Sequence, residues 1–179
     1  MIDTAIEFAL FDTAIGCCAI AWSPRGITAV RLPEGSPVAS RERLRRRFPG
    51  AREATPARDA QRVIDGIVAL LDGEPRALDD VTLDMHGVPE FNRRVYEVAR
   101  TIPWGATLSY GDIARRLGDA GAARDVGQAL GQNPFAIVVP CHRVVAADGT
   151  CGGFSARDGV ATKRRLLSIE CAQRSLLDD

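Results

Sequence analysis

The sequence predicts two folded parts. The first, over residues 1–87, is an α/β domain with an antiparallel meander plus helices, and the second, over residues 88–179, is a mainly α helix-turn-helix (winged-helix-like) domain. Three observations predict this division. Short apolar segments broken by turn residues open the chain, a helical period of apolar residues begins near Val88, and two short helical patterns flank a glycine-containing turn.

The N-terminal part carries the pattern of a scaffold. Residues 5–11, 16–22 and 26–32 are short apolar segments separated by turns, which predicts a β-meander. A charged, exposed helix is expected over residues 40–48, and the apolar spacing of residues 56–71 predicts an amphipathic helix. A further candidate strand covers residues 81–85. Because this part contains no polar constellation of its own, we expect it to support the fold.

Composition and charge exclude several classes of protein. With 46% hydrophobic and 26% charged residues among 179, the chain can bury a core, which excludes a disordered or fibrous chain. The net charge is zero. Residues 1–90 contain 11 basic and 14 acidic groups, and residues 91–179 contain 12 basic and 9 acidic groups. This small asymmetry is as consistent with chance as with a function. For the run Arg45–Arg47, a solvated helix face is favoured over a phosphate-binding patch.

The compartment and the cysteines set the kind of chemistry to expect. No apolar run is long enough for a membrane span and no secretory leader opens the chain, so a cytoplasmic protein without a membrane partner is expected. Its five cysteines should therefore remain thiols. Cys17, Cys18 and Cys171 are interpreted as small packing residues.

The C-terminal part begins with a helix that Pro103 ends, and a helix-turn-helix pattern follows. Ser109 with Asp112 three residues later predicts a helix start, and a second helix is expected over residues 122–131 after a glycine-containing turn. This pattern fits a DNA-binding helix-turn-helix and an ordinary αα-corner equally well. The small residues Ala123 and Gly127 favour the first, because a nucleic-acid backbone could approach the second helix closely.

The most informative stretch surrounds Cys141. The apolar run over residues 135–139 predicts a buried segment that Pro140 ends, presenting the thiol next to His142 and Arg143. This electropositive setting should favour the thiolate, with the imidazole as its base. For an arbitrary Cys-His pair an inert buried thiol is the better interpretation. Here the flanking apolar segments favour a shaped site.

Other thiol chemistry is disfavoured by spacing. No protease signature surrounds Cys141, and the cysteines and histidines lack the spacing of a zinc site, so neither a metal nor another cofactor is expected. A reactive thiol directly after a helix-turn-helix indicates chemistry on DNA, which requires that the target nucleotide leave the base stack. Arg124 is suited to fill the resulting gap, and Tyr110 to line the pocket for the base.

These residues together resemble the O6-alkylguanine-DNA alkyltransferases, also called methylated-DNA–protein-cysteine methyltransferases. The resemblance rests on Pro140-Cys141-His142-Arg143-Val144, with Asn133-Pro134, Ser109-Tyr110 and Ala123-Arg124 before it and Gly152-Gly153-Phe154-Ser155 after it. It covers residues 88–171 strongly. It implies a single irreversible transfer of the alkyl group from guanine O6 in double-stranded DNA to Cys141, without a cofactor or an obligate protein partner.

The resemblance also implies roles for individual residues. The catalytic set comprises Cys141, His142, Glu170 and Asn133: His142 would accept the thiol proton through a water, Glu170 would orient His142, and Asn133 would brace the turn. The DNA-binding set comprises Tyr110, Arg124, Ala123, Gly127 and Ser155, with Arg124 replacing the extruded base and Ser155 beside guanine O6. From the residues alone, an exposed Glu170 near the end of a helix over residues 159–169 is the default expectation.

The sequence departs from the common family pattern at several positions. Asp125 and Gln128 stand where small residues are usual, Phe154 replaces a tyrosine, and Ala156 follows Ser155 in place of a glycine. Three other functions remain in competition: a lesion-binding protein without transfer, a transcription regulator and an unrelated thiol hydrolase. The presence of Cys141 argues against the first, the chain length against the second, and the absence of a separate histidine motif against the third.

Overall fold

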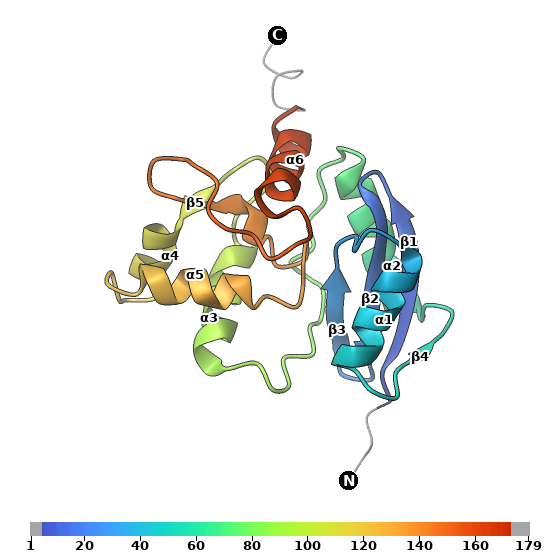
Figure 1. Ribbon diagram of the computed structural model, residues 1–179. Helices are drawn as coiled ribbons and strands as arrows, with labels where there is room; N and C mark the ends of the chain where they lie inside the picture. The colour runs from blue at the N-terminus through green and yellow to red at the C-terminus, as the bar shows by residue number, and fades with distance from the viewer. Residues whose placement is uncertain (1–4, 173–179) are drawn as a thin grey trace. The chain divides into compact units, whose positions relative to one another are not determined.

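The computed structural model describes the backbone of residues 5–172 and the side chains of residues 5–170 (Figure 1). It divides into two compact units, Met1–Met85 with Pro134–Ala136 and His86–Asn133 with Ile137–Asp179. Three residues from the C-terminal half of the chain thus belong to the first unit, which a single boundary at residue 87 does not anticipate. Within residues 5–172, no helix combines the length and apolar character needed to cross a bilayer.

The first unit is built on a four-stranded sheet. Its strands are β1 (Glu7–Thr13), β2 (Gly16–Ser23), β3 (Gly26–Arg31) and the short β4 (Arg52–Glu53), in the order β3-β2-β1-β4. The three long strands are antiparallel neighbours, which confirms the predicted meander. Strand β4, which no sequence pattern predicted, pairs parallel to β1 and makes the sheet mixed.

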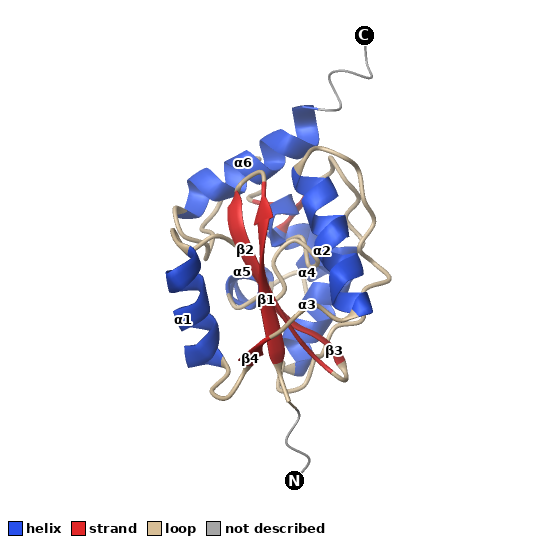
Figure 2. Cartoon of the chain, turned by 90° about the vertical axis from the view of Figure 1, so that its right-hand side faces the viewer, coloured by secondary structure: helices blue, strands red, loops and turns tan. Residues whose placement is uncertain are grey.

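Two helices cover the sheet, one on each face (Figure 2). On one side α1 (Pro37–Arg47) inserts Leu44 among Phe8, Ala19 and Ala21. On the other side lies α2 (Arg58–Leu71), an amphipathic helix with six buried residues. Helix α1 begins three residues before the predicted start at residue 40, because Ser36 caps it by accepting a hydrogen bond of 3.1 Å from the backbone N–H of Ala39.

The predicted strand over residues 81–85 is wrong. The segment touches the sheet through one parallel bridge between Ile27 and Leu83. The next residue, Asp84, points inward and accepts hydrogen bonds from Ser23 Oγ at 2.7 Å and Arg25 Nε at 3.1 Å. A buried carboxylate needs such hydrogen-bond partners. Because the backbone turns Asp84 toward Ser23 and Arg25, this segment does not keep the regular conformation of a strand.

The second unit is mainly helical. It contains α3 (Glu90–Arg100), α4 (Tyr110–Arg116), α5 (Ala123–Gly131) and α6 (Gly159–Ala172), with a two-stranded parallel sheet of β5 (Leu108–Ser109) and β6 (Val144–Val145) and the 3-10 helix η1 (Cys141–Arg143). The expected helix-turn-helix pair is α4 and α5.

Local sequence accounts for the ends of α4. Ser109 and Asp112 form a capping box: Asp112 N–H donates to Ser109 Oγ at 3.0 Å and Ser109 N–H donates to Asp112 Oδ2 at 2.8 Å. At the other end, Gly118 has a φ of 86° and Asp119 N–H donates back to Ala114 O at 3.1 Å. This is the Schellman ending that favours glycine, and it turns the chain toward α5.

The apolar run before Cys141 is buried as predicted, but it does not form a regular strand. Ile137, within the run, has a φ of 71°, the left-handed region that a β-branched side chain rarely adopts. Asn133 Nδ2 donates to Val139 O at 3.0 Å and closes the loop around it. The chain therefore reaches Cys141 through a strained turn held by a side chain.

Candidate active site

The pairing of β5 with β6 brings the two parts of the site together. Leu108 lies opposite Val144 and Ser109 opposite Val145. Tyr110, the first residue of α4, directly follows β5, whereas β6 directly follows η1 and its first residue, Cys141. Two segments about 30 residues apart in the chain thus meet through one short sheet.

Cys141 lies almost completely inside the second unit, with 8% of its surface exposed. The side-chain amide of Asn133 and the backbone N–H groups of Cys141 and His142 hydrogen-bond to its sulfur. Burial raises the pKa of the thiol, and this outweighs the hydrogen bond from Asn133 and the positive charge of Lys163, which lower it. The resting thiol is therefore protonated, contrary to the expectation of a thiolate.

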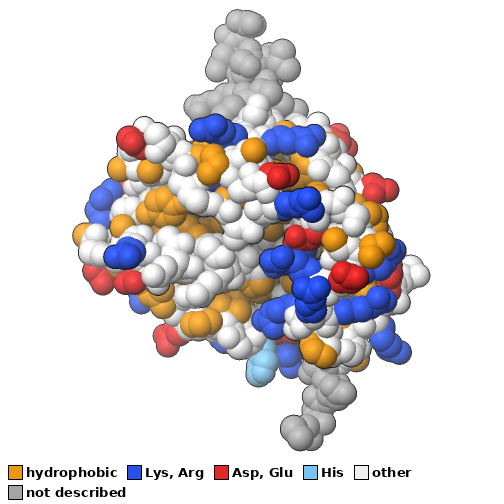
Figure 3. All heavy atoms as spheres, in the orientation of Figure 1, with side chains coloured by type: hydrophobic (Ala, Val, Ile, Leu, Met, Phe, Trp, Pro, Cys, Tyr) orange, Lys and Arg blue, Asp and Glu red, His pale blue; other side chains and the backbone are white. Residues whose placement is uncertain are grey.

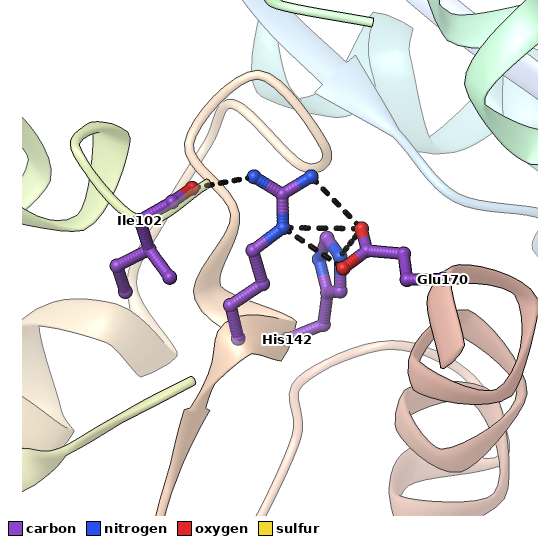
Figure 4. Close-up of polar contacts among 4 residues, drawn as sticks. Ile102, His142 and Glu170 are labelled. Carbon is purple, nitrogen blue, oxygen red and sulfur yellow. Dashed lines mark hydrogen bonds and ion pairs between the residues drawn. The ribbon is translucent and has the colours of Figure 1, made fainter. Parts of the chain in front are cut away.

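The source of positive charge also differs from expectation. The guanidinium of Arg143 does not serve the thiol, because its Nε and Nη2 donate to Glu170 and its Nη1 donates to Ile102 O at 2.7 Å (Figure 4). The imidazole of His142 is uncharged, because burial lowers its pKa and outweighs the influence of Glu170, which raises it. The cation that acts on Cys141 is Lys163.

His142 and Glu170 form a buried pair. Nε2 of His142 lies 2.7 Å from Oε1 of Glu170, and each side chain is 1% exposed. Burial acts to raise the pKa of Glu170, but the hydrogen bonds from His142 and Arg143 prevail and hold it at about 2. Glu170 is therefore an ionised acceptor, and Nε2 of the neutral imidazole must carry the hydrogen.

This tautomer leaves Nδ1 of His142 as an unprotonated base. Nδ1 is buried and has no hydrogen-bond partner among the described residues. Its lone pair can accept a proton directly or through one water. The carboxylate, imidazole and thiol together have the composition of an activated nucleophile: a thiol, a base in the next residue and a third group that orients the base.

Helix α6 supplies two charged groups from one buried face. Lys163 and Glu170 are seven residues apart, about two turns, so they lie on the same side of the helix. Both are 1% exposed, and Leu166 between them is also buried. The default expectation of an exposed Glu170 is wrong, and α6 continues past residue 169 to Ala172.

For Lys163 the sequence predicted no role, and for Arg143 it predicted only a positive charge that favours the thiolate. A signal for Lys163 was present, because it is the only lysine of the chain and stands where Leu166 and Glu170 complete one helical face. Arg143 lies inside the PCHR motif, but the sequence could not show that it turns away from the thiol to Glu170.

Tyr110 contacts both Lys163 and the loop that follows β6. Lys163 Nζ is 3.4 Å from the Tyr110 hydroxyl and 5.7 Å from the ring centroid. A Cβ atom on Gly152 would lie 2.7 Å from the same hydroxyl. Burial raises the pKa of Tyr110, and the neighbouring Cys141 and Cys151 raise it further, so the phenol is a neutral hydrogen-bonding group.

The residues expected to meet DNA lie on α5 and on the loop before α6. Arg124 is exposed and has no hydrogen-bond or ion-pair partner among the described residues. Ala123 is half-buried, and a Cβ on Gly127 would lie 3.8 Å from the Tyr110 ring, which places this glycine beside Tyr110. Ser155 is exposed, and no hydrogen bond joins it to Cys141.

Comparison with known proteins identifies the family of the chain. The family model described as 6-O-methylguanine DNA methyltransferase, DNA binding domain, matches residues 90–172. A methylated-DNA–protein-cysteine methyltransferase of Mycolicibacterium paratuberculosis is 38% identical over 168 residues, covering 92% of both chains. One from Methanothermobacter thermautotrophicus is 37% identical over 151 residues, covering 84% of this chain and 77% of the relative.

A solved structure agrees as well. The crystal structure of Mycobacterium tuberculosis OGT in complex with DNA has a TM-score of 0.76 and 36% sequence identity, and the match covers 92% of each chain. At this identity and coverage the likeness extends over both units. The chain therefore belongs to the methylated-DNA–protein-cysteine methyltransferase family.

Proposed function

We propose that this protein repairs DNA by transferring the alkyl group of O6-alkylguanine to the sulfur of its own Cys141. One observation carries the proposal. The ionised Glu170 holds His142 in the tautomer that leaves Nδ1 free to take a proton. The adjacent residue, Cys141, carries a thiol that burial keeps protonated. Such a thiol must lose its proton at the moment of attack, and Nδ1 is the base suited to take it.

The transfer conserves atoms and charge. The thiol proton passes through a water to Nδ1 of His142, and the sulfur attacks the alkyl carbon in line with its bond to guanine O6. The S–C bond forms as the C–O bond breaks, and the proton held by His142 is given up to neutralise the released guanine anion. His142 returns to its neutral form, and the net change exchanges alkyl group and hydrogen. The resulting thioether has no leaving group that could regenerate the thiol, and each molecule acts once.

Lys163 and Asn133 support the sulfur as it becomes an anion. Both lower the pKa of Cys141 against the effect of burial. Their contribution grows as negative charge develops in a site with little water, where fixed charges and dipoles act most strongly. Lys163 also holds the Tyr110 hydroxyl, which we assign to the pocket that receives the base.

Helices α4 and α5 form the DNA-binding element, which we assign to the winged-helix type. An atom inside a base stack is out of reach of a side chain, so the target nucleotide must be extruded. Arg124, exposed and without a partner among the described residues, fills the gap that the base leaves. Ala123 and Gly127 allow close approach of the backbone, and Ser155 lies beside guanine O6 once the base is bound.

In this proposal, residues 88–179 carry both DNA binding and chemistry, and residues 1–87 support them. The binding should depend on phosphate contacts, with little sequence preference beyond the lesion, and should weaken with salt.

The test is to incubate the protein with a duplex oligonucleotide containing one O6-methylguanine and measure the intact mass. The expected result is a gain of one methyl group that peptide mapping assigns to Cys141. The Cys141→Ser variant should bind the same duplex and gain nothing. Binding without any mass gain by the unaltered protein would contradict transfer and favour lesion recognition alone, and methylation elsewhere in the chain would reject Cys141 as the acceptor.

A further inference from the structure

Four arginines of the first unit gather where α1 passes the end of β3. Arg43, Arg46 and Arg47 are three and four residues apart on α1, so they lie on one face of the helix. Arg31 is the last residue of β3. Burial is the main cause that lowers its pKa, and the nearby charges of Arg43 and Arg47 lower it further. We refer to these four residues as the arginine cluster.

The arginine cluster has little compensating negative charge. Two of its members share one carboxylate: Glu34 Oε1 lies 3.4 Å from Arg31 Nη2 and 3.3 Å from Arg43 Nε. Arg46 is exposed and has no ion-pair partner among residues 5–170. Glu42 stands four residues before Arg46, the spacing of a helical ion pair, but the structure does not join them.

Fold stability explains only part of this arrangement. The last turn of α1 holds Arg46 and Arg47, where the helix dipole favours positive charge. The dipole does not account for Arg31 or Arg43, and like charges at these helical spacings repel one another. Arg47 also stacks on the Phe48 ring at 5.0 Å, which holds a guanidinium at the surface. The cluster thus presents ordered cations that the fold leaves mostly unneutralised.

We propose that the arginine cluster binds the phosphate backbone of DNA, as a contact of the first unit separate from the helix-turn-helix. Guanidinium groups match the geometry of phosphate oxygens and bind them in pairs of hydrogen bonds. In Figure 3, basic side chains gather over the part of the surface where Figure 1 draws α1. Duplex DNA is favoured over an acidic protein because it carries one charge per ~1.7 Å, dense enough for several arginines together.

This inference goes beyond the proposed function, although both need a duplex partner. It is tested with unmodified duplex DNA, by measuring affinity as a function of salt concentration for the unaltered protein and for the Arg43→Ala/Arg47→Ala variant. Each lost phosphate contact should reduce the slope of log K against log salt by about 0.9, so the double variant should lose about 2. The matched control is Arg62→Ala/Arg76→Ala, which removes two exposed arginines of the same unit that pair with Asp80 and Glu74.

The expected result is a reduced slope for the first variant and an unchanged one for the control, with unchanged methyl transfer from free O6-methylguanine. A slope equal to that of the unaltered protein, or an equal reduction in the control, would overturn the proposal. If the double variant does not fold, Arg46→Ala replaces it, because Arg46 is exposed and makes no hydrogen bond or ion pair with residues 5–170. Its slope should fall by about 0.9. Failure of the unaltered protein to transfer methyl would instead count against the proposed function.

Discussion

Glu170 and His142 are joined by a hydrogen bond of 2.7 Å between Oε1 and Nε2, although 28 residues separate them in the chain. Arg143, the neighbour of His142, binds the same carboxylate through Nε and Nη2. Glu170 therefore has two functions: it selects the tautomer of His142, and it neutralises a buried guanidinium. The two functions lead to separate predictions.

Replacing Glu170 by Gln should slow methyl transfer. The amide is a weaker acceptor and no longer restricts the hydrogen to Nε2, so Nδ1 is less often available as a base. General-base catalysis contributes about 10²–10⁴-fold to a rate, and a loss toward the lower end is expected, measured by single-turnover transfer from methylated duplex. His142→Asn should cause at least the same loss. Transfer at the original rate in both variants would show that the thiol does not use this base.

The Glu170 carboxylate should make the free energy of unfolding depend on pH in the acidic range. Because its folded-state pKa is about 2, against an ordinary value of 4.5, Glu170 stabilises the folded protein above pH 4.5. This contribution should decline as the pH falls from 4.5 toward 2. Urea unfolding between pH 2 and 5 measures it, and Glu170→Gln should remove this part of the pH dependence. Equal slopes in the variant and the unaltered protein would contradict the assignment.

Lys163→Met should shift the reactivity of Cys141 to higher pH. The lysine charge lowers the pKa of the thiol against the effect of burial, so its removal should raise that pKa further. The rate of Cys141 alkylation by iodoacetamide, followed by peptide mass spectrometry over a pH range that extends well above the ordinary thiol value of 9.0, gives the titration midpoint. Lys163→Arg keeps the charge and should largely restore the midpoint. A purely structural role of Lys163 would change the folded fraction without moving the midpoint.

Gly152→Ala should impair the site, whereas Gly153→Ala should not. A Cβ at position 152 would lie 2.7 Å from the Tyr110 hydroxyl, but one at position 153 meets nothing within 4 Å. Because Lys163 Nζ contacts the same hydroxyl, the Tyr110 side chain can move away from the new Cβ only if it loses this contact. We expect a slower single-turnover rate for the first variant and an unchanged rate for its neighbour. Equal rates would mean that the loop moves aside without cost.

Arg124→Ala should slow repair of duplex DNA more than transfer from free O6-methylguanine. The side chain is exposed and unpartnered among the described residues, so its removal should leave the fold and the thiol intact. Only the duplex requires a residue that fills the gap left by an extruded base. Comparing the two substrates isolates this role, and equal slowing of both would assign Arg124 to a different step.

Much of the fold followed from local patterns. The meander was predicted because its strands are short apolar segments between turns, and α4 because Ser109 and Asp112 can cap only a helix that begins there. The errors lie where distant residues decide. β4 has two residues and exists only by pairing with β1, and residues 81–85 left the strand pattern because Asp84 turns inward to Ser23.

The sequence by itself determined the family and predicted Cys141 as the acceptor thiol, because PCHR and its flanking motifs are contiguous and specific. Tertiary structure alone decided the protonation states. Burial keeps Cys141 protonated and His142 neutral, whereas the hydrogen bonds from His142 and Arg143 keep Glu170 ionised against the effect of burial. These states depend on which charges and hydrogen bonds meet in the buried site, and the elements that supply them, α6 and η1, meet only after the chain has folded.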